Sequence, residues 1–273
     1  MSPPSLAAAP SGGPASRLLK LSGAAWFCAA AAGQAAFISF ILIYYGSRTV
    51  TGNWAAWNDK PLIDGYTEGD TAGNLVFIAH VLLAAVVTLG GLMQLLPALR
   101  RRVPALHRWT GRFFLVISIF MALSGLWLTV VRGTLLSEIS AVAILINGAL
   151  ILIFAVVAWR DAAARRIERH RVWAMRTFIV VSGVWFLRVG LMGWVLLNQG
   201  PAGMNDTLSG PADIALTFGS YLIPLALLEL YFAAGRSQSR AIKLSVAAAI
   251  GLATLYTGAG IVGTIAFMWG PYL

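Results

Sequence analysis

The chain has 273 residues, of which 59% are hydrophobic and only 11% are charged, and its mean hydropathy is +0.78. A soluble globular domain is about 45–50% apolar and about 25% charged, so this composition excludes a soluble protein and indicates a membrane protein. The formal net charge of +10 would suit nucleic-acid binding, but the positions of the basic residues favour a topology signal instead.

Seven apolar segments approach the ~20 residues that a helix needs to cross a bilayer. The predicted transmembrane helices are 22–45, 73–96, 110–131, 139–159, 174–197, 213–235 and 244–268. Lipid offers no hydrogen-bond partner to the backbone, so a spanning chain forms helices or a closed barrel. The ~10-residue alternating segments of a barrel do not occur in this sequence. We therefore predict an all-α integral membrane protein with about seven transmembrane helices.

The first of these helices is too long, and starts too late, for a cleaved signal peptide, so it is expected to be retained. Before it, residues 1–21 are predicted to form a disordered cytoplasmic tail, because their first part is rich in Pro, Ala, Ser and Gly. Residues 22–268 are predicted to form the transmembrane bundle, and residues 269–273 a short outer C-terminus.

Most of the lysines and arginines lie at one end of the predicted helices. That end carries Arg17, Lys20, Arg100, Arg101, Arg102, Arg108, Arg112, Arg160, Arg165, Arg166, Arg169, Arg171, Arg176, Arg236, Arg240 and Lys243. Only Arg48, Lys60 and Arg132 lie at the other end. The positive-inside rule predicts a multi-pass protein of the cell inner (plasma) membrane, with the N-terminus cytoplasmic and the C-terminus outside. The basic loops are expected to bind anionic lipids, and no nucleic-acid partner is predicted.

Two similar basic motifs mark the starts of the third and fifth predicted helices. The first reads His107-Arg108-Trp109-Thr110-Gly111-Arg112, and the second reads His170-Arg171-Val172-Trp173-Ala174-Met175-Arg176. In each motif a Trp and an Arg are three positions apart, so they share a face of the helix. Each of these helices closes a hairpin over a short basic loop, which is a weak internal repeat.

Because both helices start at the same end, His107 and His170 are predicted to lie at one membrane depth. If the helices are neighbours, the two imidazoles would ligate one haem b iron, and Arg108, Arg112, Arg171 and Arg176 would pair with its propionates. The same layer would also suit a quinone headgroup, a phosphate, or a metal with Glu229. In the plainest alternative the histidines only border the lipid and the arginines extend to the headgroups. No metal-ligand motif and no catalytic residue is predicted.

A second set of polar residues lies at predicted membrane depth: His80, Gln94, Arg188 and Glu229. Ionisable groups are costly in a bilayer, so each is a candidate functional residue. His80 and Arg188 are expected at similar depth, where two cations would repel unless His80 is neutral or an anion is shared. Ala84, Val87, Gly91 and Gln94 follow His80 on one small face, which is suited to close helix packing.

The segment from His80 to about Arg188 resembles a family of predicted bacterial membrane proteins of unassigned function, domain of unknown function 2306 (DUF2306). The resemblance rests on His80, on the run Gly91-Leu92-Met93-Gln94-Leu95-Leu96-Pro97, on Gly125-Leu126, and on the two histidine motifs. It implies a membrane location and a helical core at about 73–197, and it implies no activity. In outline the arrangement is also similar to cytochrome b561-type bundles, but this chain lacks half of their histidines.

The leading functional hypothesis is therefore a membrane redox protein that binds haem b or a quinone. One alternative is a small-solute transporter or channel, which the many glycines and the few buried charges would suit, although no inverted repeat or broken-helix pair is predicted. Another is a non-catalytic membrane assembly partner that docks through its basic loops. Whether the protein is an enzyme is left open by the sequence.

Overall fold

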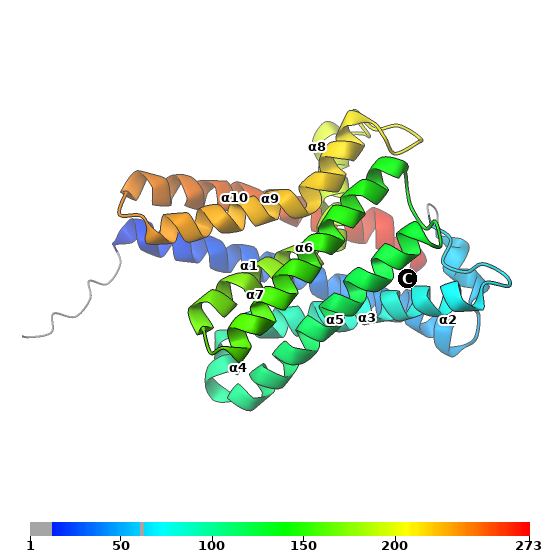
Figure 1. The fold of residues 1–273 in the computed structure, drawn as a ribbon. Coiled ribbons are helices and arrows are strands. Elements are labelled where there is room, and N and C mark those ends of the chain that lie inside the picture. Colours follow the sequence, from blue (N-terminus) through cyan, green and yellow to red (C-terminus); the bar gives the residue numbers. More distant parts are fainter. Residues whose placement is uncertain (1–12, 61–62) are drawn as a thin grey trace, which may run out of the picture.

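A computed structural model describes residues 13–60 and 63–273 (Figure 1). These residues form helices and connecting loops, with no strand among them. The α-helices are α1 (Pro14–Phe40), α2 (Ser47–Val50), α3 (Thr71–Leu95), α4 (Pro97–Arg102), α5 (Pro104–Val130), α6 (Glu138–Ala163), α7 (Ile167–Val181), α8 (Gly183–Asn198), α9 (Pro211–Arg236) and α10 (Arg240–Gly263). Short π-helical turns continue α1 over Ile41–Gly46 and α10 over Thr264–Trp269.

The described chain contains six continuous helical segments that are long and apolar enough to cross a membrane. The helices α7 and α8 together make a seventh, bent by 54°. The prediction of an all-helical protein with about seven spanning segments is therefore confirmed. The first segment begins at Pro14, so residues 14–21, which the sequence placed in a disordered tail, belong to α1. The rest of that predicted tail, residues 1–12, lies outside the described residues.

The predicted span 174–197 is a broken helix rather than the continuous one expected. α7 ends at Val181 and α8 begins at Gly183. The hydroxyl of Ser182 donates to the carbonyl of Phe178 at 2.8 Å and accepts from Nε2 of Gln34 at 3.1 Å. Serine side chains that bond to the preceding turn favour bending of a helix. The sequence analysis predicted no broken helix, and this prediction is wrong for the α7–α8 span.

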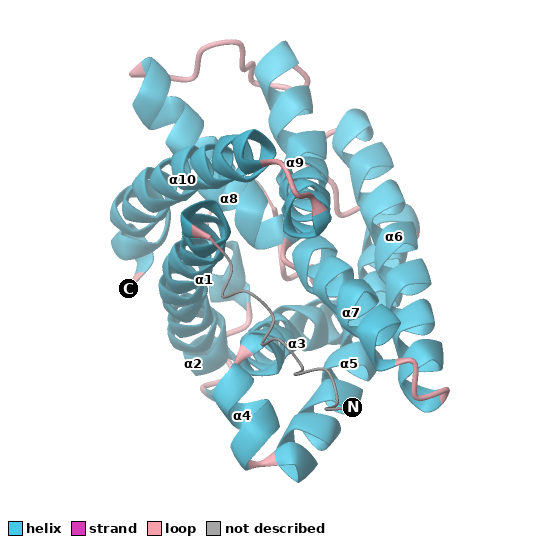
Figure 2. Ribbon diagram, turned by 90° about the vertical axis from the view of Figure 1, so that its left-hand side faces the viewer, coloured by secondary structure: helices cyan, strands magenta, loops and turns pink. Residues whose placement is uncertain are grey.

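The two predicted hairpins are present, since α3 packs on α5 and α6 packs on α7. α5 also packs on α6, while α10 packs on both α1 and α8. Viewed from the end where α1 begins, α1, α3, α7 and α9 surround a common centre (Figure 2). The small face predicted on α3 contributes to this packing, because a Cβ at Gly91 would lie 2.8 Å from Phe178 and 3.1 Å from Phe114.

The bundle has two chemically different ends. The basic end, as we call it, carries the start of α1, the arginines of α4, the α6–α7 turn and the α9–α10 turn. In Figure 1 the basic end is on the left, and the C-terminus lies at the right beside the segment around α2. Aromatic residues from that segment contact the C-terminal turns, as in the edge-to-face pair of Tyr44 and Tyr272 at 5.9 Å.

At the end opposite the basic end, Arg132 holds the connection before α3 in place. Its Nε donates to Oδ2 of Asp70 at 2.9 Å, and one terminal nitrogen donates to Oδ1 of Asn74 at 2.8 Å and to the carbonyl of Gly65 at 3.1 Å. Oδ1 of Asp70 also accepts from the backbone N–H of Gly73 at 2.9 Å, which caps the first turn of α3. The network joins the start of α3 to the end of α5.

This network predicts a pH-dependent stability. The Gly73 N–H, followed by Arg132, holds the pKa of Asp70 below its ordinary value of 3.8. A carboxyl whose folded-state pKa is depressed stabilises the fold fully above its ordinary pKa, and that contribution is lost as the pH falls through the folded-state value. We therefore expect Asp70→Asn to lower the midpoint of thermal unfolding at pH 7, and the difference from wild type to shrink below pH 3.8.

Thermal unfolding in detergent between pH 7 and pH 3 measures this difference directly. The matched control is Asp206→Asn, because Asp206 is an exposed loop carboxylate with no ion pair among the described residues. That variant is expected to unfold like wild type at every pH. An Asp70→Asn deficit of constant size across the range would contradict the role given to its charge.

Candidate functional site

A cavity of about 1030 Å³ lies between α1, α3, α4, α5, α7, α8, α9 and α10. Its charged, histidine and amide side chains gather toward the basic end: Gln94, Arg100, His107, Glu168, His170 and Arg171. Away from that end the wall is mainly apolar and aromatic, with Trp26, Phe114, Phe178, Phe186 and Trp194 among its residues. Ligand pockets for small organic molecules have about 300–1,000 Å³, so this cavity is large enough for one.

The cavity reaches the outer surface of the helices near α8, α9 and α10. Among its lining residues, Leu197, Ile223 and Leu252 are 71%, 61% and 70% exposed. Exposed leucine and isoleucine side chains on spanning helices face the acyl chains of a bilayer. The cavity therefore has an apolar opening toward the lipid and a polar inner region near the histidines.

His170 enters the cavity from α7 and is oriented by α6. Its Nδ1 lies 2.9 Å from the carbonyl oxygen of Ala158. A carbonyl only accepts hydrogen bonds, so Nδ1 carries the ring proton and Nε2 of the neutral ring is an acceptor. The α6–α7 hairpin thus fixes the tautomer of His170 and leaves Nε2 for the cavity.

His107 enters the same cavity from α5 and is oriented by Gln94 of α3. With its amide nitrogen toward His107, Gln94 donates to Nδ1 at 3.2 Å, while its oxygen accepts from Thr110 Oγ1 at 2.6 Å and from the Gly111 N–H at 3.1 Å. This orientation, assigned from the hydrogen-bond network, gives both amide atoms suitable partners. Nδ1 of His107 is then an acceptor, so Nε2 carries the proton and is a donor.

The two histidine motifs are therefore similar in structure as well as in sequence. In each hairpin the preceding helix engages Nδ1 of the histidine, and Nε2 has no hydrogen-bond partner among the described residues. They differ in tautomer, because one Nε2 donates and the other accepts. The structure thus brings His107 and His170 into the lining of one cavity.

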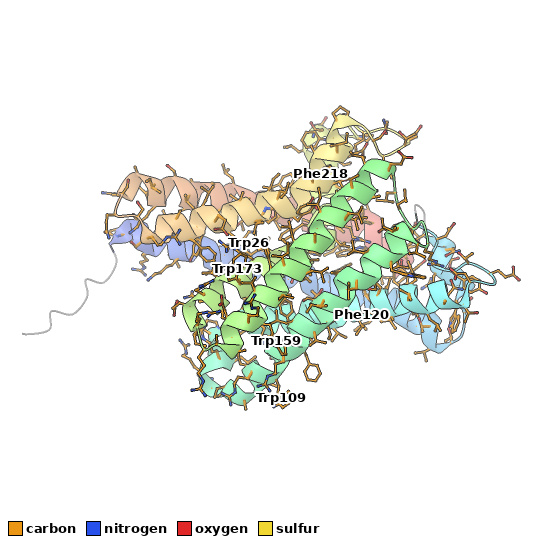
Figure 3. The ribbon with its side chains drawn as sticks, in the orientation of Figure 1. Trp26, Trp109, Phe120, Trp159, Trp173 and Phe218 are labelled. Carbon is orange, nitrogen blue, oxygen red and sulfur yellow. The ribbon has the colours of Figure 1, made fainter. Side chains whose placement is uncertain are left out.

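The arginines of the two motifs lie mostly elsewhere. The guanidinium of Arg112 lies 4.9 Å from the ring centroid of Trp109, and that of Arg176 lies 4.3 Å from Trp173, as the three-residue spacing predicts. Arg176 also binds Glu229 through two hydrogen bonds of 2.6 and 2.9 Å. In Figure 3, Trp109 projects outward from the bundle.

Among the described residues only part of the predicted arginine set lines the cavity. Arg171 does so, whereas Arg108, Arg112 and Arg176 do not. Sequence reasoning missed Arg100 and Glu168, which line the polar region. Arg100 belongs to a run of three arginines, which the sequence assigns to a basic loop as a topology signal and as a docking surface for lipid or protein. Its place in the cavity follows from the turn of α4, which Pro97 begins.

The second predicted polar set is dispersed. His80 lies against α5, where its Nδ1 is 2.8 Å from Oγ of Ser124, and a Cβ at Gly125 would lie 3.3 Å from its ring. Arg188 lies 5.6 Å from the ring centroid of Phe37. Gln94 and Glu229 belong to the contacts described above, so the set does not form a single site.

Several buried polar atoms near the break between α7 and α8 were not expected from the sequence. Oε1 of Gln34, Oδ1 of Asn147 and the hydroxyl of Tyr221 have no hydrogen-bond partner among the described residues. A Cβ at Gly183 would lie 3.1 Å from the Asn147 amide and 3.5 Å from Tyr221. Unpaired buried polar groups are costly, so a water or a solute at the break would stabilise them.

A family model described as "Predicted membrane protein (DUF2306)" matches residues 77–232. The match extends from α3 to α9 and includes both histidine motifs, the broken helix and Glu229. No curated protein and no solved structure matches the chain. Because the family model covers more than half of the 273 residues, this chain is a multi-pass membrane protein that belongs to the DUF2306 family.

Proposed function

We propose that this protein binds a membrane quinone, with the quinone headgroup between His107 and His170. One observation carries the proposal: a donor and an acceptor nitrogen share the polar region of a large apolar cavity. A quinone is an apolar molecule with two polar oxygens, so it needs a lipophilic wall and a few well-placed hydrogen-bonding groups. The lipid-facing opening supplies an entry route and room for an isoprenoid tail.

The two histidines suit both oxidation states of such a ligand. A quinone carbonyl only accepts hydrogen bonds, and Nε2–H of His107 would donate one. A quinol hydroxyl also donates, and Nε2 of His170 would accept that bond. Arg100 and Arg171 line the same region, where a cation stabilises negative charge on a ligand oxygen more strongly than in water.

The two histidines, with the tautomers described above, do not fit a haem b whose iron both rings would ligate. Each ligating histidine offers an unprotonated Nε2 to iron and donates through Nδ1 to a neighbour. His170 meets this requirement, but His107 carries its proton on Nε2 when Gln94 faces it as above. Arg112 and Arg176, which would bind the propionates, are directed to Trp109 and Glu229.

Tryptophan fluorescence tests the proposal. Trp26 and Trp194 line the cavity, whereas Trp109 is 57% exposed and does not line it. A short-chain quinone added to the protein in detergent is expected to quench fluorescence saturably, by an amount that decreases in Trp26→Phe and Trp194→Phe and is retained in Trp109→Phe. Linear quenching of equal size in all variants would contradict the proposal, and so would an absorption spectrum of stoichiometric haem.

A second candidate function is transport of a small solute, favoured by the broken α7–α8 span. Transporters bind their substrates where discontinuous helices leave polar groups free near the middle of the membrane. The unpartnered oxygens of Gln34 and Asn147 lie at such a break. Solute flux into liposomes measures this function. The flux measurement does not depend on whether the fluorescence assay detects quinone binding.

We propose a bacterial inner membrane as the location, with the basic end in the cytoplasm. The proposal is supported by the concentration of arginines at that end. The arginines of the basic end would then lie near anionic lipid headgroups. The attraction between the membrane surface and each arginine contributes about 1 kcal/mol to binding.

A further inference from the structure

At the end of the bundle opposite the basic end, four aromatic rings form a stack. Phe37 and Phe40 of α1 both stack on Trp269, at centroid distances of 5.5 and 5.6 Å, and Tyr44 stacks on Phe40 at 5.4 Å. Trp269 and Tyr44 are almost completely buried. The stack joins the first spanning segment to the C-terminal turn, and it forms one continuous aromatic surface.

Two cations lie against the two phenylalanine rings of this stack. The guanidinium of Arg188 lies 5.6 Å from the Phe37 centroid, and Nζ of Lys60 lies 5.7 Å from the Phe40 centroid. Aromatic rings stabilise a cation, but by only ~0.5–2 kcal/mol. Neither cation forms an ion pair with a carboxylate of the described chain. The two positive charges are therefore left without a carboxylate partner among the described residues.

The third cation of the stack provides a contrast. Arg48 lies 3.9 Å from the Tyr44 centroid and pairs with Asp59 at 3.8 Å. The Tyr44 hydroxyl donates to the carbonyl of Ala56 at 3.1 Å. Arg48 thus has a carboxylate partner, whereas Lys60 and Arg188 have none among the described residues. The hydrogen bond that Arg188 forms is to a backbone carbonyl, that of Val184, at 3.0 Å.

An unpaired donor lies in the same stack. The indole Nε1–H of Trp269 has no acceptor among the described residues, although the side chain is only 1% exposed. Buried N–H groups in folded proteins are almost always hydrogen-bonded. The cluster therefore offers donors of three kinds, the indole N–H, the guanidinium of Arg188 and the ammonium of Lys60, and none of them has a carboxylate partner among the described residues.

The pKa of Lys60 is lowered, as expected for a partly buried amine beside a second cation. Lys60 lies outside the spanning helices, where burial and then the positive charge of Arg188 lower its pKa to about 8. A lysine in this position is partly neutral near physiological pH, and a bound anion would restore its charge. The ammonium of Lys60 would then contribute a positive charge to a binding site.

We propose that Lys60 and Arg188 bind one oxyanionic group, a carboxylate or a phosphate, against the aromatic stack. A guanidinium binds such groups through two parallel hydrogen bonds, and a lysine adds a point charge. The group can come from a small solute or from a phospholipid headgroup, since the two present the same chemistry. This site is separate from the cavity of His107 and His170 and does not depend on quinone binding.

The chain has only three lysines, Lys20, Lys60 and Lys243, which makes the test direct. Each amine is acylated over a range of pH in a non-ionic detergent without added anions, and its modification is followed by mass spectrometry. Half-maximal labelling of Lys60 is expected near pH 8 and that of the other two at clearly higher pH. Inorganic phosphate, acetate or phosphatidylglycerol is then added in separate samples.

An anion that binds is expected to slow labelling of Lys60 at least tenfold at pH 8 and to leave Lys20 and Lys243 unchanged. Protection by phosphate or acetate identifies a solute site, and protection by phosphatidylglycerol alone identifies a lipid site. Arg188→Gln is expected to abolish the protection and Trp269→Phe to reduce it. Arg48→Gln, the matched control, should retain it. Lack of protection by all three probes, or equal protection in Arg188→Gln, would overturn the proposal.

Discussion

Replacing His170 with alanine is expected to weaken binding of a short-chain quinone by about tenfold to a hundredfold. The substitution removes the only imidazole acceptor at the polar region of the cavity. An unpaired polar group costs about 1–3 kcal/mol, and each 1.4 kcal/mol changes a dissociation constant tenfold. His107→Ala is expected to produce a loss of similar size, since it removes the donor. Saturable quenching of tryptophan fluorescence measures both affinities.

The control for this prediction is His80→Ala. His80 is also a half-buried histidine, but its hydrogen bond is to Ser124, and it does not line the cavity. The quinone affinity of this variant is expected to match that of wild type. If all three histidine variants lost affinity to the same extent, the effect would reflect general destabilisation of the bundle, and the assignment of His107 and His170 would fail.

A second large effect is expected at Gly260, where α10 crosses α8. A Cβ at this position would overlap the carbonyl oxygen of Val189 and lie 2.8 Å from its Cγ1. A backbone oxygen cannot move aside as a flexible side chain can, so the two helices must separate. Overpacking of this kind costs about 1–3 kcal/mol. Gly260→Ala is therefore expected to lower the unfolding midpoint by ~2–4 °C for each kcal/mol lost.

The matched control lies two residues away on the same helix. A Cβ at Gly258 would meet no atom within 4 Å, and alanine is favoured over glycine in a helix by about 1 kcal/mol. Gly258→Ala is expected to leave stability unchanged or to raise it. Thermal unfolding of both variants in one detergent gives the comparison. Equal shifts would contradict the close approach of α8 and α10.

The sequence predicts those features of this protein that depend on local periodicity and on charge. The lengths of the apolar segments predict the spanning helices, and the three-residue spacing predicts the pairing of Trp109 with Arg112 and of Trp173 with Arg176. The break at Ser182 could not be predicted in the same way. It involves a hydrogen bond from Gln34, which is 148 residues distant in the sequence.

At the candidate site, too, some features are predicted by the sequence and others depend on tertiary packing. The shared topology of the two hairpins predicts that His107 and His170 lie at one depth, but their tautomers depend on the Gln94 amide and the Ala158 carbonyl. Those contacts come from packing of the preceding helix, which no local pattern encodes. Arg176 was predicted to bind an acidic group of a ligand and instead binds the carboxylate of Glu229.

The central claim is that a quinone occupies the cavity between His107 and His170. A quinone with a photoreactive azide on its ring, irradiated with the purified protein and mapped by mass spectrometry, tests it most directly. The account predicts labelling of α5 and α7 near the two histidines, suppressed by excess unlabelled quinone. Labelling confined to exposed residues such as Leu255, Val262 and Phe267, with no effect of the competitor, would contradict it.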